Sequence, residues 1–168
     1  YGYMLGDYVR DKDAVTAALM LTEMAAWYAD QGLTLAEALD ALYEKYGYYA
    51  EHTYNLVMPG LDGLKDMANL MKNLRENPPA EISGVKAVQF KDYSDGSVTD
   101  CATGGKSTME LSGSNVLRFE MADGTSVIVR PSGTEPKIKF YILTQGKDAA
   151  GAKANVDKYG EWVKSLQK

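Results

Sequence analysis

The chain has 168 residues, of which 45% are hydrophobic and 24% are charged, a composition typical of a folded globular protein. Its formal net charge of −5 argues against nucleic acid as the main partner, because proteins that bind the phosphate backbone usually carry a basic excess. No apolar run reaches the ~18 residues that a membrane span needs, and the single cysteine, Cys101, excludes an intramolecular disulfide and a multi-cysteine metal site. A lone cysteine suits a reducing compartment, so we expect a cytoplasmic protein with no nucleic-acid or membrane partner.

Two helices are predicted at the start of the chain. Residues 13–30 are rich in helix formers and carry apolar side chains around most of the helix, which predicts burial on more than one side. Thr34 begins a second helix, because Glu37 three residues later completes a capping box, and Gly47 ends it. Neither helix has a strand of its own, so we assign residues 1–47 to the end of a neighbouring α/β domain.

The rest of the chain mixes strand and helix patterns. Aromatic and β-branched residues predict a strand over 48–57, and apolar residues at helical spacing predict a helix over 61–75. The polar connection over 92–114 shows no clear pattern, and its structure stays open. The remaining predicted elements are strands over 85–91, 117–121, 126–130 and 137–142 and a helix over 148–166.

Asp123-Gly124 is a hairpin signal between two of these strands, so the sheet is predicted to be antiparallel. The order of the elements after residue 47 predicts an α+β fold, in which helices cover one face of that sheet. We therefore expect residues 48–168 to form a domain of their own.

Residues 130–136, with the sequence Arg-Pro-Ser-Gly-Thr-Glu-Pro, join two predicted strands and suit a phosphate group. Arg130 offers a planar fork of donors for two phosphate oxygens, and Ser132 and Thr134 add hydroxyl donors. Gly133 permits a positive φ, which would let successive backbone N–H groups converge on an anion. The loop is therefore a candidate anion-binding site.

The residues around this loop leave two interpretations. Pro131 and Pro136 restrict the backbone, which predicts a largely pre-ordered loop, and Lys137 or Lys139 would add positive charge. Glu135 is interpreted as structural, bound to the loop amides or to a lysine. A plain hairpin turn is the alternative, because Ser, Gly, Thr and Pro are all turn residues. That alternative gives no reason for the gathering of an arginine, two hydroxyls and two lysines.

The run from Arg130 to Pro136 resembles the phosphate-binding loop in the last domain of α-D-phosphohexomutases, the phosphoglucomutase/phosphomannomutase family. The resemblance extends over Asn115-Val116-Leu117, the Asp123-Gly124 hairpin and residues 137–141, and it covers nearly the whole chain. It implies that residues 48–168 are the fourth, C-terminal domain, with a fold like that of the TATA-box-binding protein. Residues 1–47 are then the helical remainder of the third domain.

The resemblance implies part of an intramolecular phosphotransferase, most similar to bacterial phosphoglucomutases. Such enzymes interconvert glucose 1-phosphate and glucose 6-phosphate through a phosphoserine and the intermediate glucose 1,6-bisphosphate. Arg130, Ser132, Gly133, Thr134 and Lys139 are then expected to hold the phosphate of the phosphosugar substrate that is not reacting, which orients the sugar. The sugar stays open, because relatives act on mannose and pentose phosphates.

The family's nucleophilic serine and its Asp-rich magnesium loop have no counterpart in this sequence, so the fragment is expected to have no catalytic or metal site of its own. Mg²⁺ and the N-terminal mutase domains are expected in the full-length enzyme. Asp92, Asp95 and Asp100 lack the spacing of the metal loop and are interpreted as solvated loop and turn residues.

The opening of the chain also resembles the family. Tyr1-Gly2-Tyr3 is similar to the residues that follow the family's Glu-Glu-Ser sugar-binding motif, so we expect that motif just before the chain. In the run Arg10-Asp11-Lys12-Asp13, Lys12 matches the place of a family lysine near the reacting sugar. Lys12 is therefore a candidate for proton transfer, which would need a lowered pKa. The alternative is a solvated lysine beside a helix start.

A function from another class stays open, namely a stand-alone phosphosugar- or anion-binding module without catalysis. The reading frame upstream of Tyr1 discriminates the two, because a phosphoserine loop there supports the enzyme and a start codon near Tyr1 supports the module.

Overall fold

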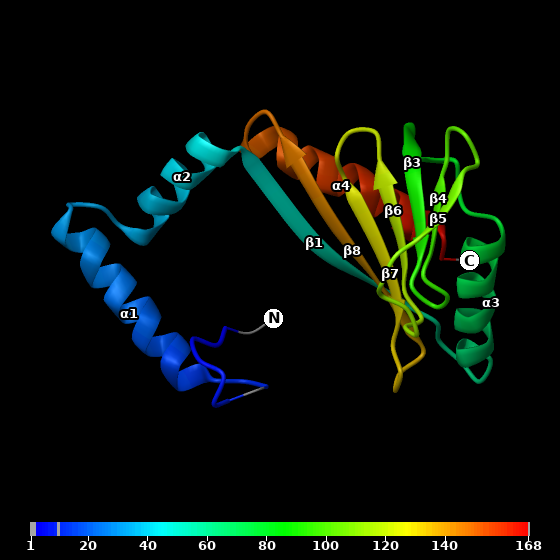
Figure 1. The fold of residues 1–168 in the computed structure, drawn as a ribbon, viewed down its shortest axis with the longest axis horizontal. Coiled ribbons are helices and arrows are strands. Elements are labelled where there is room, and N and C mark those ends of the chain that lie inside the picture. Colours follow the sequence, from blue (N-terminus) through cyan, green and yellow to red (C-terminus); the bar gives the residue numbers. More distant parts are fainter. Residues whose placement is uncertain (1–2, 10, 168) are drawn as a thin grey trace. The chain divides into compact units, whose positions relative to one another are not determined.

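The computed structural model describes residues 3–9 and 11–167 of the chain. The chain divides into two compact units, residues 1–47 and residues 48–168 (Figure 1). The predictions that concern Tyr1, Gly2 and Arg10 lie outside the described residues. Across the described part of the chain, every helix is too short or too polar to cross a membrane.

The first unit contains two helices, α1 (Ala14–Asp30) and α2 (Leu35–Tyr46). Asp13 caps the start of α1, where its carboxylate accepts the backbone N–H of Thr16 at 3.0 Å. The predicted capping box at the start of α2 is confirmed, because Thr34 and Glu37 each bind the other's backbone N–H, at 3.2 and 2.8 Å. Local sequence therefore sets both helix starts.

The prediction that α1 is buried on more than one side is wrong for this chain, because none of its residues is buried. Leu19 and Trp27 remain 58% and 61% exposed, and Ala38 of α2 is the only buried side chain among the described residues of this unit. The physical reason is that the unit contains only one other helix, which cannot surround the apolar circumference of α1.

The second unit is built on an eight-stranded sheet in which every pair of neighbouring strands is antiparallel. Along the sheet the strand order is β1-β8-β7-β6-β3-β4-β5, and β2 pairs with β3. The elements of this unit are β1 (Tyr48–Val57), α3 (Gly63–Glu76), β2 (Glu81–Ile82), β3 (Val85–Asp92), β4 (Ser97–Asp100), β5 (Lys106–Thr108), β6 (Leu117–Met121), β7 (Ser126–Pro131), β8 (Lys137–Gly146) and α4 (Ala149–Ser165).

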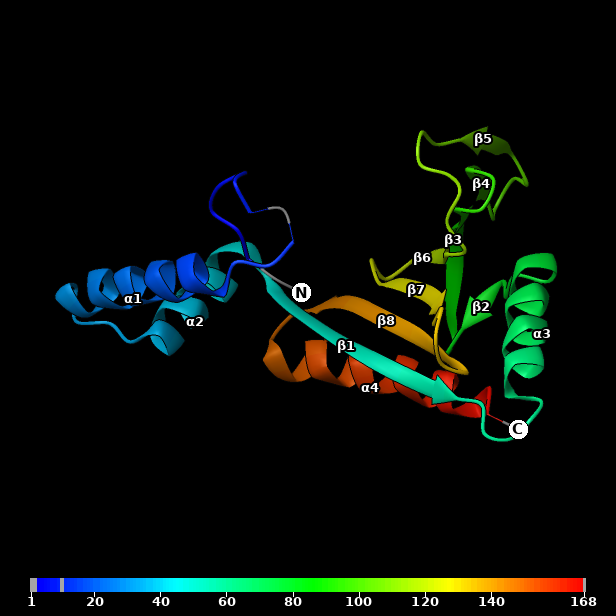
Figure 2. The same cartoon turned by 90° about the horizontal axis from the view of Figure 1, so that it is seen from below.

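One face of this sheet forms the core. Alternate residues of the central strands, such as Phe119, Val129 and Phe140, are completely buried, as strand geometry requires of side chains that share a face. Met71 of α3 and Tyr159 of α4 pack into the same cluster. Figure 2 shows α4 along β1 and β8, and α3 beside β2 and β3. The predicted fold class, an antiparallel sheet with helices on one face, is confirmed.

The Asp123-Gly124 hairpin forms as predicted between β6 and β7. Gly124 has a φ of +82°, a left-handed conformation that favours glycine, and Met121 and Thr125 close the turn with a backbone hydrogen bond of 2.8 Å. For residues 92–114 the sequence predicted no structure. The chain there forms two short strands, β4 and β5, at the edge of the sheet. The short strand β2 was not predicted either.

Candidate functional site

Two cations face each other at the end of the β7–β8 hairpin. Arg130 of β7 lies directly opposite Lys139 of β8 in the antiparallel register. Like charges at opposed positions repel each other, and no described residue forms an ion pair or hydrogen bond with the exposed Arg130 side chain. On the next strand, β1, the uncharged Asn55 lies opposite Lys139. The two facing cations therefore concentrate positive charge, and neither forms an ion pair with a described residue.

The loop that follows Arg130 is held by its own backbone. The N–H of Ser132 donates to the carbonyl of Lys137 at 2.8 Å, and the N–H of Lys137 donates to the carbonyl of Glu135 at 2.7 Å. The carbonyl of Pro136 accepts the N–H of Met58 at 2.8 Å, which ties the loop to the segment before α3. These bonds order the loop before any ligand arrives.

Glu135 holds one of the two candidate lysines. Its carboxylate forms an ion pair with Lys137, and that hydrogen bond, with the charges of Lys137 and Lys139, lowers the pKa of Glu135. The interpretation of Glu135 as a structural residue that holds a lysine agrees with this contact. Because Lys137 is neutralised in this way, Lys139 is the lysine left to act with Arg130.

The expected anion-binding nest, in which successive backbone N–H groups converge on an anion, is not formed as predicted. Gly133 does not have a positive φ, so the predicted reason for a glycine at this position is wrong. Instead, the backbone N–H groups of Thr134 and Glu135 converge on the side-chain oxygen of Ser132, at 3.4 and 3.3 Å. A side chain at Gly133 would meet no atom within 4 Å, so the glycine leaves open space beside the loop. The Ser132 hydroxyl occupies the position that an anion would take in a nest.

A hollow of about 560 Å³ lies beside the loop and is bounded by three segments. Residues 130–133 form one wall and Ser114, Asn115 and Val116 form another. Helix α3 supplies the third wall, with Met67, Ala68 and Met71. The first turn of α3 lies close to the loop, because a Cβ on Gly63 would clash with the carbonyl of Met58 and lie 3.1 Å from Pro136. The arrangement places Arg130 and Ser132 on a concave surface, where an anion could be held by donors from several sides.

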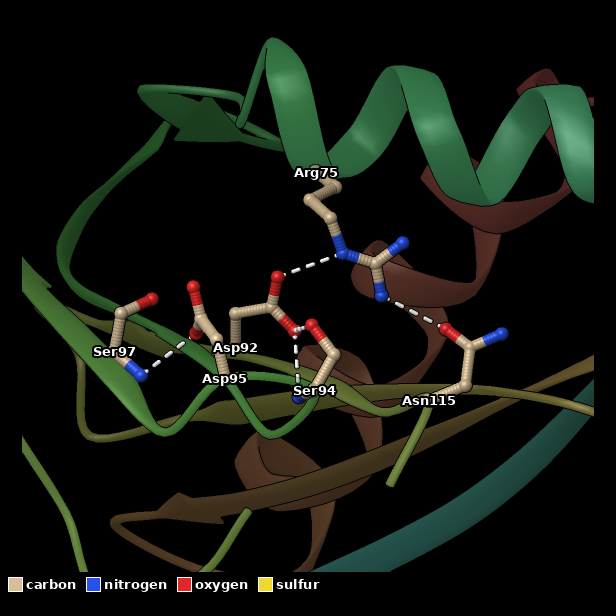
Figure 3. Close-up of polar contacts among 6 residues, drawn as sticks. All are labelled: Arg75, Asp92, Ser94, Asp95, Ser97 and Asn115. Carbon is tan, nitrogen blue, oxygen red and sulfur yellow. Dashed lines mark hydrogen bonds and ion pairs between the residues drawn. The ribbon is translucent and has the colours of Figure 1, made fainter. Parts of the chain in front are cut away.

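A polar cluster that the sequence did not predict stands behind one wall of this hollow. The Nε of Arg75, near the end of α3, lies 2.6 Å from the carboxylate of Asp92, and its Nη2 donates to the Oδ1 of Asn115 at 2.8 Å (Figure 3). The backbone N–H and the hydroxyl of Ser94 donate to the other carboxylate oxygen of Asp92, at 2.9 and 2.7 Å. The cluster thus joins α3, β3 and the segment before β6.

The interpretation of Asp92 as a solvated loop residue is wrong, because its side chain is only 6% exposed and its carboxylate is paired with Arg75. A buried carboxylate needs such partners to remain charged. Asp95 and Asp100 do behave as turn residues, since their carboxylates accept backbone N–H groups two or three residues ahead, at 2.7 to 3.0 Å. No local sequence pattern indicates the Arg75–Asp92 contact, because the contact depends on how α3 packs against the sheet.

Lys12 lies in the first unit, away in sequence from the loop. Its side chain is 83% exposed, and its Nζ lies 2.9 Å from the carboxylate of Asp11. Among the described residues no group buries the Lys12 side chain, whereas a proton-transfer lysine needs burial to lower its pKa. The contact with Asp11 agrees with the alternative of a solvated lysine at the start of α1.

Residues 3–9 and 11–167 contain no group of three His, Cys, Asp or Glu side chains that could hold a metal ion. The described residues therefore offer no cluster of three such ligands to a magnesium ion. Partial burial of the sulfur, together with the charge of Asp100, raises the pKa of the Cys101 thiol, which favours its protonated form.

The comparisons with known proteins all point to the same protein family. Residues 67–157 match the family model of the phosphoglucomutase/phosphomannomutase C-terminal domain. The chain is 36% identical over 166 residues to a probable phosphomannomutase of Haemophilus influenzae, covering 98% of this chain and 31% of that protein. It is 35% identical over 148 residues to a phosphoglucomutase of Staphylococcus aureus, covering 88% of this chain and 27% of that protein. The chain thus spans less than a third of the length of these curated relatives.

A solved structure shares the fold. The open form of the exocytosis-sensitive phosphoprotein pp63/parafusin of Paramecium, a phosphoglucomutase, aligns with a TM-score of 0.53 and 20% sequence identity. The alignment covers 95% of this chain and 28% of the Paramecium protein. At this identity the likeness concerns the fold alone.

Proposed function

This chain belongs to the phosphoglucomutase/phosphomannomutase family, and we propose that it is the substrate-phosphate-binding part of a phosphoglucomutase. The full enzyme would interconvert glucose 1-phosphate and glucose 6-phosphate through a phosphoserine and a bisphosphate intermediate. In this proposal the chain does not perform the chemistry itself. It holds the phosphate at the end of the sugar that is not reacting.

The observation that supports the proposal is that Arg130, which lines the hollow, lies opposite Lys139 and that neither side chain forms an ion pair with a described residue. The guanidinium can donate two parallel hydrogen bonds to one phosphate, and the ammonium adds a second positive charge. A phosphate between them would relieve their repulsion, which makes binding more favourable than for an isolated cation. Glu135 supports this role, because it forms its ion pair with Lys137 and not with either of the two facing cations.

The loop hydroxyls and backbone N–H groups complete the proposed phosphate-binding site. The Thr134 hydroxyl forms no hydrogen bond with a described residue, and Thr134 and Gly133 are exposed. The bonds from Thr134 and Glu135 to Ser132 are long, at 3.4 and 3.3 Å, so a charged phosphate oxygen can compete for these N–H groups. Because the loop is already ordered, little conformational entropy is lost on binding.

The test is an amide-NMR titration of the 168-residue chain with inorganic phosphate, glucose 1-phosphate and unphosphorylated glucose. We expect the backbone amide shifts to be largest at residues 130–134 and 139 with both phosphates and absent with glucose. A single phosphate grip of this kind should bind at about millimolar levels, near 4 kcal/mol. Arg130→Ala should abolish the shifts. Lys147→Ala, which removes the same charge beyond the other end of β8, should leave them unchanged. Equal losses in both variants, or no shifts at all, would refute the proposal.

A phosphomannomutase is a second candidate, because a relative named for mannose and one named for glucose match this chain almost equally, at 36% and 35% identity. The two sugars differ only in the configuration at one carbon, which a phosphate grip does not contact. Activity of the full-length protein with glucose 1-phosphate and mannose 1-phosphate, compared as kcat/KM, would decide between them, and pentose phosphates belong in the same comparison.

We further propose that residues 1–47 are the end of the family's third domain. Support comes from α1, whose apolar residues lie open along a hollow of about 820 Å³ and need a partner to be covered. The length of the relatives supports N-terminal domains in cis, and the single cysteine supports a cytoplasmic location. The fluorescence of Trp27 tests the assignment of residues 1–47 to the third domain. Its emission maximum should lie at a shorter wavelength in the full-length protein than in this chain. An unchanged spectrum would contradict the assignment.

No step of this proposal is assigned to magnesium in this chain, since its described residues do not fit a metal site. Magnesium and glucose 1,6-bisphosphate belong to the proposed reaction of the full-length enzyme.

A further inference from the structure

Asn115 is a polar residue on the wall of the hollow that the proposed phosphate grip does not use. It lies two residues before β6, and the start of β6 lies beside the end of β7, because Leu117 pairs with Val129. Arg130 is the residue that follows Val129. The register therefore brings Asn115 and Arg130 to the same end of two neighbouring strands, and both line the same hollow.

The backbone holds this wall in place independently of side chains. The N–H of Tyr93 donates to the carbonyl of Val116 at 2.9 Å, and the N–H of Ser114 donates to the carbonyl of Tyr93 at 3.0 Å. These bonds flank Asn115 on both sides. The contact between Arg75 and Asn115 is therefore not needed to position residues 114–116. What the contact does is orient the side-chain amide of Asn115.

An asparagine amide has one acceptor and one donor group, and Arg75 engages only the acceptor. The Nη2 of Arg75 donates to Oδ1 of Asn115 at 2.8 Å, whereas Nδ2 donates to no described atom. Figure 3 shows this nitrogen on the side of the amide that points away from Arg75. Arg75 is itself fixed by Asp92, which neutralises its charge. With its oxygen bonded to the guanidinium, the amide has its N–H groups left to donate, Asn115 lines the hollow, and the bond to Arg75 also polarises these N–H groups.

From this geometry we propose that Asn115 contacts the phosphate through its Nδ2 and that Arg75 is a positioning residue that fixes the amide. An amide held in this way favours an anion and repels a cation. The inference rests on the proposed function, because the phosphate in question is the one held by Arg130.

The experiment follows the side-chain amide signals of Asn115 by NMR while inorganic phosphate is added to the 168-residue chain. These signals should shift together with those of Arg130. Asn115→Asp keeps an oxygen for Arg75 but replaces the donor by a negative charge, so we expect the phosphate Kd to rise about tenfold or more. Asn115→Ala removes the donor without adding charge and should raise Kd about threefold to tenfold. Asn69→Asp, an exposed change on α3 outside the hollow, is the matched control and should change Kd less than about twofold.

A cycle of variants tests the positioning role. Arg75→Lys keeps a positive charge for Asp92 but lacks the second arm that reaches Asn115, so Kd should rise about threefold. In the Asn115→Ala background the same change should have no further effect, because the amide that Arg75 orients is gone. Additive losses would overturn the positioning role, since Arg75 would then act by another route.

The outcomes separate the two proposals. If Arg130→Ala abolishes phosphate binding while Asn115→Ala and Asn115→Asp bind as well as the unmodified chain, the role of Asn115 is overturned and the phosphate grip stands. A loss in Asn115→Asp alone, with Asn115→Ala unchanged, also overturns it, because the effect would be one of added charge. No binding by the unmodified chain would overturn both.

Discussion

The two units of the chain treat their apolar side chains in opposite ways. The sheet unit encloses Phe119, Phe140 and Ile142 completely, and both of its helices contribute to the same core. The helical unit leaves Leu19 and Trp27 more than half exposed. The difference teaches that the sheet unit encloses its own core, which suits the rigid loop that the proposed function requires. The helical unit leaves the apolar side chains of α1 without such an enclosure among the described residues.

The largest effect expected from this comparison is a matched pair of aromatic truncations. Phe140→Ala should lower the free energy of unfolding by about 3–5 kcal/mol, because the ring is fully buried and contacts Trp162 edge to face. Trp27→Ala should change it by less than about 0.5 kcal/mol. Urea unfolding followed by circular dichroism measures both. A comparable loss in Trp27→Ala would mean that α1 is packed in solution and that the contrast between the units is false.

A second pair compares one ion pair from each unit. Arg75→Met leaves the buried carboxylate of Asp92 with only Ser94 as a partner, so we expect a loss of about 2–3 kcal/mol. Lys12→Met removes the exposed contact with Asp11 and should have no measurable effect on stability. Thermal unfolding of the two variants beside the unmodified chain is the measurement. The contrast would be weakened if Arg75→Met unfolded at the same temperature as the unmodified chain.

Acid should act more strongly on the sheet unit. Burial alone would raise the pKa of Glu120, but hydrogen bonds from Ser126 and Lys91 and the charge of Arg118 outweigh it, so the pKa is lowered. In the helical unit the pKa of the exposed Glu37 is lowered by the backbone and side chain of Thr34. A lowered folded pKa means that each carboxylate stabilises the fold above the ordinary value of 4.5 and loses that contribution as the pH falls through its folded pKa.

The measurement is the free energy of unfolding between about pH 6 and pH 3. Glu120→Gln should flatten this dependence more than Glu37→Gln does, because Glu120 has several partners in a half-buried cluster. Equal slopes in the two variants would indicate that the cluster around Glu120 is as open to solvent as the capping box.

The smallest effect concerns the binding loop, where the sheet unit is as exposed as the helical one. Lys139→Met removes the repulsion with Arg130 and should raise the free energy of unfolding by about 0.2–1 kcal/mol in buffer without phosphate. Lys147→Met has no such neighbour in the register and serves as the control. Added phosphate should stabilise the unmodified chain but not Lys139→Met. A loss of stability in Lys139→Met would show that the ammonium has a partner in the folded chain.

Much of the fold was predictable because local signals agreed with the final packing. Alternation of apolar and polar residues defined β6 and β8, and the capping box and the Asp123-Gly124 turn fixed where elements start and reverse. The short edge strands β4 and β5 were not predictable, because a strand of three or four residues at an edge has no buried face long enough to give a periodic signal. The two residues of β2 were missed for the same reason.

The sequence by itself determined the antiparallel sheet, its helices and the position of the loop at residues 130–136 between two strands, because the properties involved are local. They are the period of the apolar residues, the turn chemistry and the run of an arginine, hydroxyls and prolines. Only the tertiary structure decided that Lys139 rather than Lys137 faces Arg130, and that Gly133 does not adopt a positive φ. It also decided that Arg75, Asp92 and Asn115 meet, since three segments far apart in the chain must pack before their side chains touch. Contacts of this kind depend on register and on helix packing, neither of which a single sequence encodes as a local pattern.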